Sequence, residues 1–202
     1  MITLQPQLLS VDNFAPYGHV IEAAEQSNNQ MNGTFARFDD LALIDAKEPS
    51  PNESGAQTSI SIVRSQIPTL LPHRFNLVEC HPLCSQAFIP RSKFQFYVVV
   101  APPCPESENK VDAKDLRAFI TNGHQGISYF SGTWHMPLIA LAPDQEFLVV
   151  DQATRQGNLR EHQFDDFDGT GNDIDATTIA ARGPWASALD LHVATRPAAT
   201  SC

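Results

Sequence analysis

Apolar and polar residues alternate with a period of two along most of the chain, and helical periodicity is scarce. Alternation is typical of strands with one covered face. The segment 94–101 is apolar at nearly every position, which predicts a strand covered on both faces. The predicted strands span residues 58–65, 75–81, 94–101, 116–121, 127–130, 138–141 and 147–150.

Turn signals separate these strands. Asn122-Gly123 follows the strand at 116–121, and this dipeptide is the strongest short signal for a hairpin. One short helix is expected over residues 10–18, with Ser10 as N-cap and Gly18 as its end. Many short strands with turns between them predict a mainly β domain, a sandwich or a barrel, with a few short helices.

The sequence divides into a barrel domain and a different tail. Residues 1–165 carry the strand pattern as a single domain, which suits a chain of 202 residues. Residues 166–202 are rich in Ala, Thr and Pro and are expected to form a C-terminal extension that packs on the barrel or trails from it. One further strand is expected there, at 189–194.

Charge and composition narrow the classes of partner. The net charge is −10, and phosphate binding needs clustered Lys and Arg, so we expect neither a nucleic acid nor an anionic membrane surface as partner. No apolar run approaches the roughly 20 residues that span a bilayer, and the N-terminus lacks a signal-peptide pattern. We therefore expect a cytoplasmic protein, whose cysteines at positions 80, 84, 104 and 202 are free thiols.

Two short segments, 79–90 and 126–137, place polar side chains inside apolar strand pattern. Phe75, Leu77, Glu79 and His81 share one strand face, and the two apolar residues predict that this face points inward. A buried carboxylate beside an imidazole is costly unless the two are partnered, so this pair indicates a metal site or an acid–base pair. A buried Glu–His ion pair that only closes the strand is the alternative.

His135 is the third candidate, presented by the turn at 132–135 in the second segment. A satisfied core histidine is the alternative for His135 alone. Three inward polar groups from two strands favour a functional site.

The order E-x-H-x4-Q followed by G-x2-H resembles the two-motif signature of cupin barrels. The resemblance implies a cupin-like β-barrel or jelly roll (a double-stranded β-helix), with Glu79, His81, Gln86 and His135 at the metal-ligand positions. These donors can hold Ni²⁺, Mn²⁺, Fe²⁺ or Zn²⁺, and Ni²⁺ or Mn²⁺ is the expected cofactor. The chain has no glycine-rich phosphate loop, so we expect no nucleotide cofactor.

Six blocks in order resemble the ureidoglycolate lyase family. They lie at residues 14–22, 37–42, 61–66, 81–90, 116–123 and 132–137. The resemblance implies a homodimer that splits ureidoglycolate into glyoxylate and urea during the degradation of purines through allantoin.

Two residues depart from the family pattern. Phe130 and Met136 stand where the family often has histidine. Two alternatives therefore stay open. One is a non-catalytic cupin-type sensor or binder of glyoxylate-like small acids, and the other is a different cupin enzyme, such as a sugar isomerase or a metal oxygenase.

The expected reaction assigns roles to the candidate residues. Cleavage of the C–N bond removes the hydroxyl proton and protonates the leaving nitrogen, so Glu79, His81 and His135 are the expected catalytic residues, with Glu79 or His135 as base. Arg64 shares a strand face with two isoleucines and is expected to point inward, where a guanidinium suits a carboxylate. The predicted substrate-binding residues are Arg64, Arg37, Gln86 and Trp134.

Overall fold

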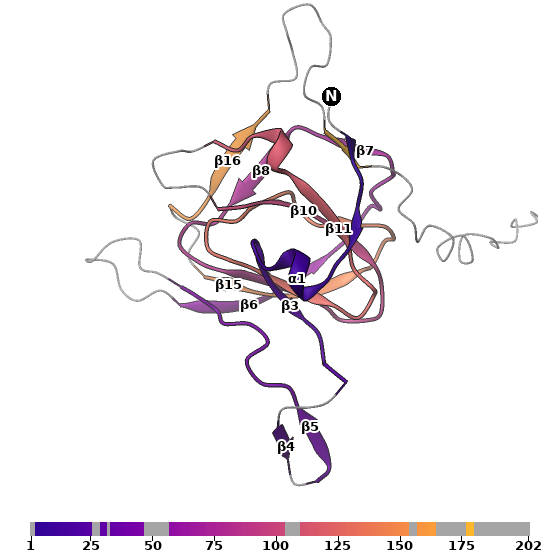
Figure 1. The fold of residues 1–202 in the computed structure, drawn as a ribbon, viewed down its shortest axis with the longest axis vertical. Helices are drawn as coiled ribbons and strands as arrows, with labels where there is room; N and C mark the ends of the chain where they lie inside the picture. The colour runs from indigo at the N-terminus through magenta and orange to yellow at the C-terminus, as the bar shows by residue number, and fades with distance from the viewer. Residues whose placement is uncertain are drawn as a thin grey trace, which may run out of the picture.

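The computed structural model describes residues 3–25, 29–31, 33–46, 57–103, 110–153, 157–164 and 177–179. Two main sheets face each other and enclose the interior of a mainly β, cupin-like fold, which confirms the predicted fold class (Figure 1). The described residues form one short α-helix, α1 (Val11–Phe14), and one 3₁₀ turn, η1 (Ala113–Asp115).

Strands far apart in the sequence lie side by side in each main sheet. The first sheet has the order β16 (Arg160–Gln163), β8 (Leu77–Cys80), β13 (Trp134–His135), β10 (Phe96–Ala101), β11 (Arg117–Ile120) and β2 (Gln7–Leu8), with β14 (Ile139–Ala140) also paired to β10. The second sheet has the order β3 (Gly18–Ile21), β12 (Gly126–Tyr129), β9 (Gln86–Pro90), β15 (Glu146–Gln152) and β6 (Thr58–Arg64).

Two smaller sheets complete the fold. One has the order β1 (Thr3–Leu4), β17 (Thr177–Ile179) and β7 (His73–Phe75). The other is the hairpin of β4 (Asn29–Met31) and β5 (Phe35–Arg37), which lies apart from the main sheets at the bottom of Figure 1.

The inner cluster fills the space between the two main sheets. It contains side chains of both sheets and of α1, which shows that the sheets pack face to face. Its buried members are Leu9, Phe14, Tyr17, Val20, Phe96, Val98, Val100, Phe119, Ile127, Tyr129, Phe147 and Val149.

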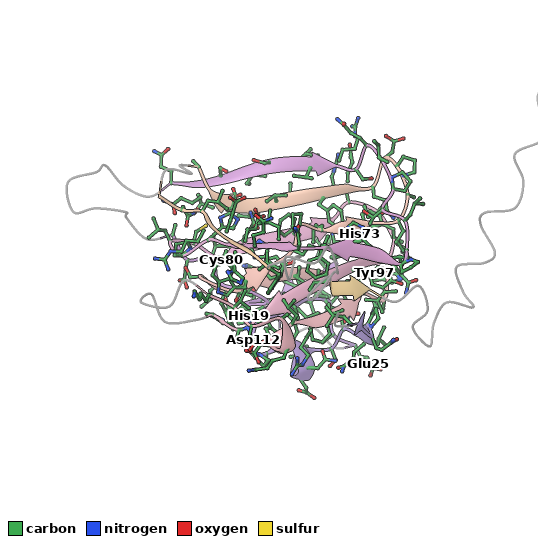
Figure 2. All side chains as sticks on the ribbon, turned by 90° about the horizontal axis from the view of Figure 1, so that it is seen from above. His19, Glu25, His73, Cys80, Tyr97 and Asp112 are labelled. Atoms are coloured by element: carbon green, nitrogen blue, oxygen red, sulfur yellow. The ribbon has the colours of Figure 1, made fainter. Side chains whose placement is uncertain are left out.

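The outer cluster lies on the other face of the first sheet, and it includes Tyr97, Val99 and Ala101 of β10. Because Phe96, Val98 and Val100 belong to the inner cluster, β10 is buried on both faces, as its apolar sequence predicted. Side chains, among them the labelled Cys80 and Tyr97, fill the body of the molecule (Figure 2).

The expected N-terminal helix forms, but it is shorter than predicted. Ser10 caps α1: its hydroxyl accepts from the Asn13 backbone N–H, and the Asn13 side chain accepts from the Ser10 N–H. Gly18 begins β3 instead of ending the helix. A Cβ at Gly18 would lie 2.1 Å from the Ser128 carbonyl oxygen, so only glycine allows β3 and β12 to approach this closely.

Two further expectations need correction. The turn at Asn122-Gly123 forms, but β11 and β12 pair in different sheets, so the turn carries the chain from one sheet to the other and makes no hairpin. The predicted strand 75–81 is two strands, β7 and β8, interrupted at Asn76. Phe75 consequently packs in the outer cluster, whereas Leu77 is exposed.

No helix among the described residues is long and apolar enough to cross a membrane. The strand expected at 189–194 and the thiols of Cys104 and Cys202 lie outside the described residues. The two described cysteines, Cys80 and Cys84, are buried thiols that form no disulfide, as expected.

Candidate functional site

A row of three residues crosses the first sheet on its inner face. Val100 of β10 stands opposite His135 of β13, and His135 stands opposite Glu79 of β8. Residues directly opposite in neighbouring strands point to the same side of a sheet. Since Val100 belongs to the inner cluster, His135 and Glu79 face the space between the sheets.

His81 completes a cluster of three potential ligands. It follows β8 directly, and its ring centroid lies 5.4 Å from that of His135. One ligand atom each from Glu79, His81 and His135 lies within 4.8 Å of the others. The structure thus brings together the three residues that the sequence assigned to catalysis.

The imidazole of His135 is neutral with a fixed tautomer. It is almost completely buried, and burial is the main cause that lowers its pKa from 6.5 to about 3, a shift that the Thr133 backbone carbonyl partly opposes. His135 Nδ1 donates to the Thr133 carbonyl oxygen at 2.9 Å, because a carbonyl can only accept. His135 Nε2 therefore carries a lone pair, and it points toward Glu79 Oε1 at 3.7 Å.

His81 is oriented in the same way. Its Nδ1 donates to the backbone carbonyl oxygen of Asn158 at 2.7 Å, which leaves Nε2 as the ligand atom. The Asn158 side chain is itself fixed, since Oδ1 accepts from the Leu83 N–H at 2.8 Å and Nδ2 donates to Cys84 Sγ at 3.1 Å. Ligand histidines usually donate their second ring N–H to a carbonyl or carboxylate, as both do here.

The donor set fits a divalent cation. His135 Nε2 is buried without a hydrogen bond, and its lone pair faces a carboxylate. The lone pair and the carboxylate oxygen repel each other, and a divalent cation between them would relieve this repulsion. Two imidazoles and one carboxylate suit Ni²⁺, Mn²⁺, Fe²⁺ or Zn²⁺.

The second sheet contributes Gln86 and Tyr129, which stand directly opposite each other on β9 and β12. The Tyr129 ring stacks on the His135 ring with centroids 4.3 Å apart and an angle of 17°. Gln86 Nε2 donates to Asp151 Oδ2 at 3.3 Å, and the Ser59 hydroxyl donates to Asp151 Oδ1 at 3.0 Å. Tyr129 therefore brings the second sheet into contact with the cluster of the first, and Gln86 is the neighbour of Tyr129 on that sheet.

Arg64 differs from its expected inward orientation. It shares a face with Ile60 and Ile62, as predicted, but Ile60 is 72% exposed and that face points away from the inner cluster. The Arg64 side chain is 61% exposed and pairs with Glu146, which raises its pKa. Alternation predicted which residues share a face, but not which face the partner sheet covers.

The structure does not bring Arg37 or Trp134 to the cluster either. Arg37 lies on the β4–β5 hairpin and pairs with Asp39 (Figure 1). Trp134 packs in the outer cluster, on the strand face opposite to His135. Their predicted part in substrate binding has no contact in this structure that supports it.

The two positions that depart from the family pattern each pack against other side chains. Met136 packs in the outer cluster, and its backbone N–H donates to the Val99 carbonyl oxygen. Phe130 packs edge-on against His19, with ring centroids 4.9 Å apart.

Three residues at the site escaped the sequence interpretation: Tyr129, Asp151 and Asn158. Tyr129 alternates with Ile127 on an apolar strand, a pattern typical of a core residue. Asp151 lies next to the last residue of β15, and its alternation with Phe147 and Val149 was an available signal that it faces inward. Asn158 acts through its backbone carbonyl, which no sequence pattern marks.

Comparisons with known proteins place the chain in a family. The family model described as Ureidoglycolate lyase matches residues 1–168. The chain is 40% identical over 165 residues to a ureidoglycolate lyase of Burkholderia mallei (strain NCTC 10229), covering 81% of this chain and 91% of that protein. A ureidoglycolate lyase of Chelativorans sp. (strain BNC1) is 40% identical over 157 residues, covering 77% of this chain and 88% of that protein. A ureidoglycolate lyase of Pseudomonas aeruginosa (strain LESB58) is 37% identical over 169 residues, covering 81% of this chain and 92% of that protein.

A family match over most of the chain, together with relatives at this identity, shows that the chain belongs to the ureidoglycolate lyase family of enzymes.

Proposed function

We propose that the protein cleaves ureidoglycolate into glyoxylate and urea, with Glu79, His81 and His135 as its catalytic centre. The observation that carries the proposal is the convergence of these three side chains on one point, inside a chain of this family. The reaction belongs to the degradation of purines through allantoin. Its carbon–nitrogen bond cleavage needs a base for the hydroxyl and a proton for the leaving nitrogen.

Glu79 is the proposed proton carrier. His135 is a poor base because its pKa is about 3, and its Nδ1 proton is engaged with Thr133. The hydroxyl and the ureido nitrogen of the substrate are bonded to the same carbon, so one carboxylate can serve both. Glu79 takes the hydroxyl proton, the C–O bond becomes a carbonyl while the C–N bond breaks, and Glu79 returns the proton to the departing urea nitrogen.

The two imidazoles would hold a divalent metal through their Nε2 atoms, with one oxygen of Glu79. Such an ion supplies a Lewis acid that lowers the pKa of a chelated hydroxyl and neutralises the adjacent carboxylate. Ni²⁺ or Mn²⁺ is the proposed cofactor, and Gln86 stays a predicted fourth ligand or substrate contact. Arg64 and Arg37 have no place in this proposal, because both side chains are exposed and paired with carboxylates.

The exposed face of the second sheet supports a homodimer. Ile60 and Ile62 of β6 are 72% and 55% exposed and stand opposite Val150 and Leu148 of β15, and Ile89 of β9 extends the same row. An apolar sheet face of this kind indicates a protein contact. A second copy of the chain is the proposed partner, and the free thiols support the cytoplasm as compartment.

The test is direct assay of both products. The purified protein is loaded with Ni²⁺ or Mn²⁺ and incubated with ureidoglycolate, and both products are measured. Glyoxylate and urea should form in equal amounts. Glu79→Gln keeps the shape of the side chain and removes the base, so it should abolish product formation. Absence of glyoxylate with every metal tried would refute the proposed function.

A further inference from the structure

Four buried polar atoms have no hydrogen-bond partner among the described residues. They are Gln86 Oε1, Ser128 Oγ, Tyr129 Oη and His135 Nε2. Native proteins leave few such atoms unpaired, because burial without a partner is costly. His135 Nε2 belongs to the metal cluster, and Ser128 points to the opposite face of β12 from Tyr129. Gln86 and Tyr129 remain unexplained by the proposed catalytic centre.

These two residues are neighbours on the inner face of the second sheet. Tyr129 of β12 is directly opposite Gln86 of β9, so their side chains leave the sheet side by side. The Tyr129 ring is almost completely buried and stacks on His135. The pair therefore borders the proposed catalytic centre.

The orientation of the Gln86 amide is fixed by its neighbour. Gln86 Nε2 donates to Asp151 Oδ2, and the other oxygen of Asp151 accepts from the Ser59 hydroxyl. A carboxylate only accepts, so a flipped amide would set two oxygens against each other. Gln86 Oε1 is therefore the acceptor left open, and the Tyr129 hydroxyl is the open donor beside it.

We propose that Tyr129 and Gln86 form the subsite that recognises the ureido group of the substrate. A ureido group carries N–H donors next to a carbonyl acceptor, which complements one acceptor and one donor standing side by side. The inference rests on the proposed function and adds to it the two residues that distinguish a ureido acid from a plain hydroxy acid. A ligand without N–H groups leaves Gln86 Oε1 buried and unpaired, which disfavours it by about 10- to 100-fold.

Two non-cleavable probes separate this subsite from the metal centre. Ureidoacetate is ureidoglycolate without its hydroxyl, so it keeps the ureido group and cannot release glyoxylate. Glycolate keeps the hydroxyl and the carboxylate and lacks the ureido group. Their dissociation constants are measured by calorimetry on the metal-loaded full chain and on its Tyr129→Phe and Gln86→Met variants.

We expect Tyr129→Phe and Gln86→Met each to raise the dissociation constant of ureidoacetate by about 10- to 100-fold. The dissociation constant of glycolate should change by less than about twofold. Tyr129→Phe keeps the ring that stacks on His135, and unchanged glycolate binding reports an intact centre. Tyr97→Phe and Gln95→Met are the matched controls. Tyr97 is buried in the outer cluster and Gln95 donates to the Thr121 carbonyl oxygen, so both probes should bind these variants as they bind the wild type.

The outcomes separate the subsite from the reaction. The subsite is overturned if the two variants lose affinity for both probes equally or for neither. It is also overturned if ureidoacetate does not bind to the wild type. If the wild type cleaves no ureidoglycolate while the two variants lose affinity for ureidoacetate and keep their affinity for glycolate, the proposed function fails and the subsite stands. If the wild type cleaves ureidoglycolate but the variants bind ureidoacetate normally, the function stands and the subsite fails.

Discussion

His135 and Glu79 stand directly opposite each other on β13 and β8, and 3.7 Å separates His135 Nε2 from Glu79 Oε1. The histidine belongs to the second polar segment of the sequence and the glutamate to the first. Antiparallel pairing of two short strands, 56 positions apart, therefore creates the centre. Both imidazoles present Nε2 to it because backbone carbonyls hold their Nδ1 protons.

Loss of either imidazole should abolish turnover without unfolding the chain. His135→Ala and His81→Ala are each expected to lower kcat at least about 100-fold, since even residues that only support metal ligands contribute 10- to 100-fold. Metal content per chain should fall in parallel, measured by elemental analysis. His124→Ala, at an exposed turn, is the control. Full activity in both variants would mean that the centre lies elsewhere.

The pH dependence of stability should carry the signature of a buried neutral histidine. The pKa of His135 is lowered from 6.5 to about 3 by burial, so between these values the unfolded chain binds a proton that the folded chain does not. Stability therefore falls as pH drops from 6.5 toward 3, by up to about 1.4 kcal/mol per pH unit from this group. Above pH 6.5 the group makes no difference.

Urea unfolding of the metal-free protein across this range measures the effect. His135→Gln has no proton to bind at this position, so its stability should decline less steeply with falling pH than that of the wild type. Parallel curves for the two proteins would show that His135 is not buried in its neutral form.

Asn158 should matter through the position of His81. Asn158→Ala removes the acceptor of the Leu83 N–H and the donor to Cys84 Sγ, which frees the turn that follows His81. We expect metal affinity about 10- to 100-fold lower and stability lower by about 1–3 kcal/mol. Asn158→Asp keeps the acceptor of the Leu83 N–H, so its metal affinity and stability should lie between those of the wild type and of Asn158→Ala. Unchanged metal affinity in Asn158→Ala would show that the backbone alone positions His81.

The sequence was sufficient where a property depends on neighbours along the chain. The capping of α1 by Ser10 and the two-sided burial of β10 both follow from local pattern. It was insufficient where a property depends on pairing. Arg64 and the two isoleucines beside it share a face, but only the packing of the second sheet shows that this face is exposed.

Tyr129 illustrates a different limit. An aromatic residue in an apolar strand is typical of a core, and Tyr129 does pack in the inner cluster. What marks it as functional is its hydroxyl without a partner and its stacking on His135. Both depend on which strand of the other sheet it faces, and neither is written in local periodicity.

The exposed apolar face of β6 should determine the oligomeric state. Ile60→Asp and Ile62→Asp place a charge in the proposed contact and should shift the protein from dimer to monomer in sedimentation velocity. Ile67→Asp is the matched control, since Ile67 is 82% exposed but lies beyond β6. A wild type that sediments as a monomer, or a dimer that both variants leave intact, would contradict this interface.

The C-terminal extension should contribute to stability and not to catalysis. β17 pairs with both β1 and β7, whose Leu4 and Phe75 belong to the outer cluster, and it lies beyond residue 168, where the family match ends. Ending the chain at residue 168 removes these backbone hydrogen bonds, so we expect Tm to fall by several degrees, about 2–4 °C per kcal/mol lost. The kcat should stay within about twofold, because all members of the inner cluster and of the catalytic centre precede residue 168. A truncated chain with unchanged Tm would show that β17 does not hold the small sheet together, and one that folds but loses its activity would give the extension a role at the site.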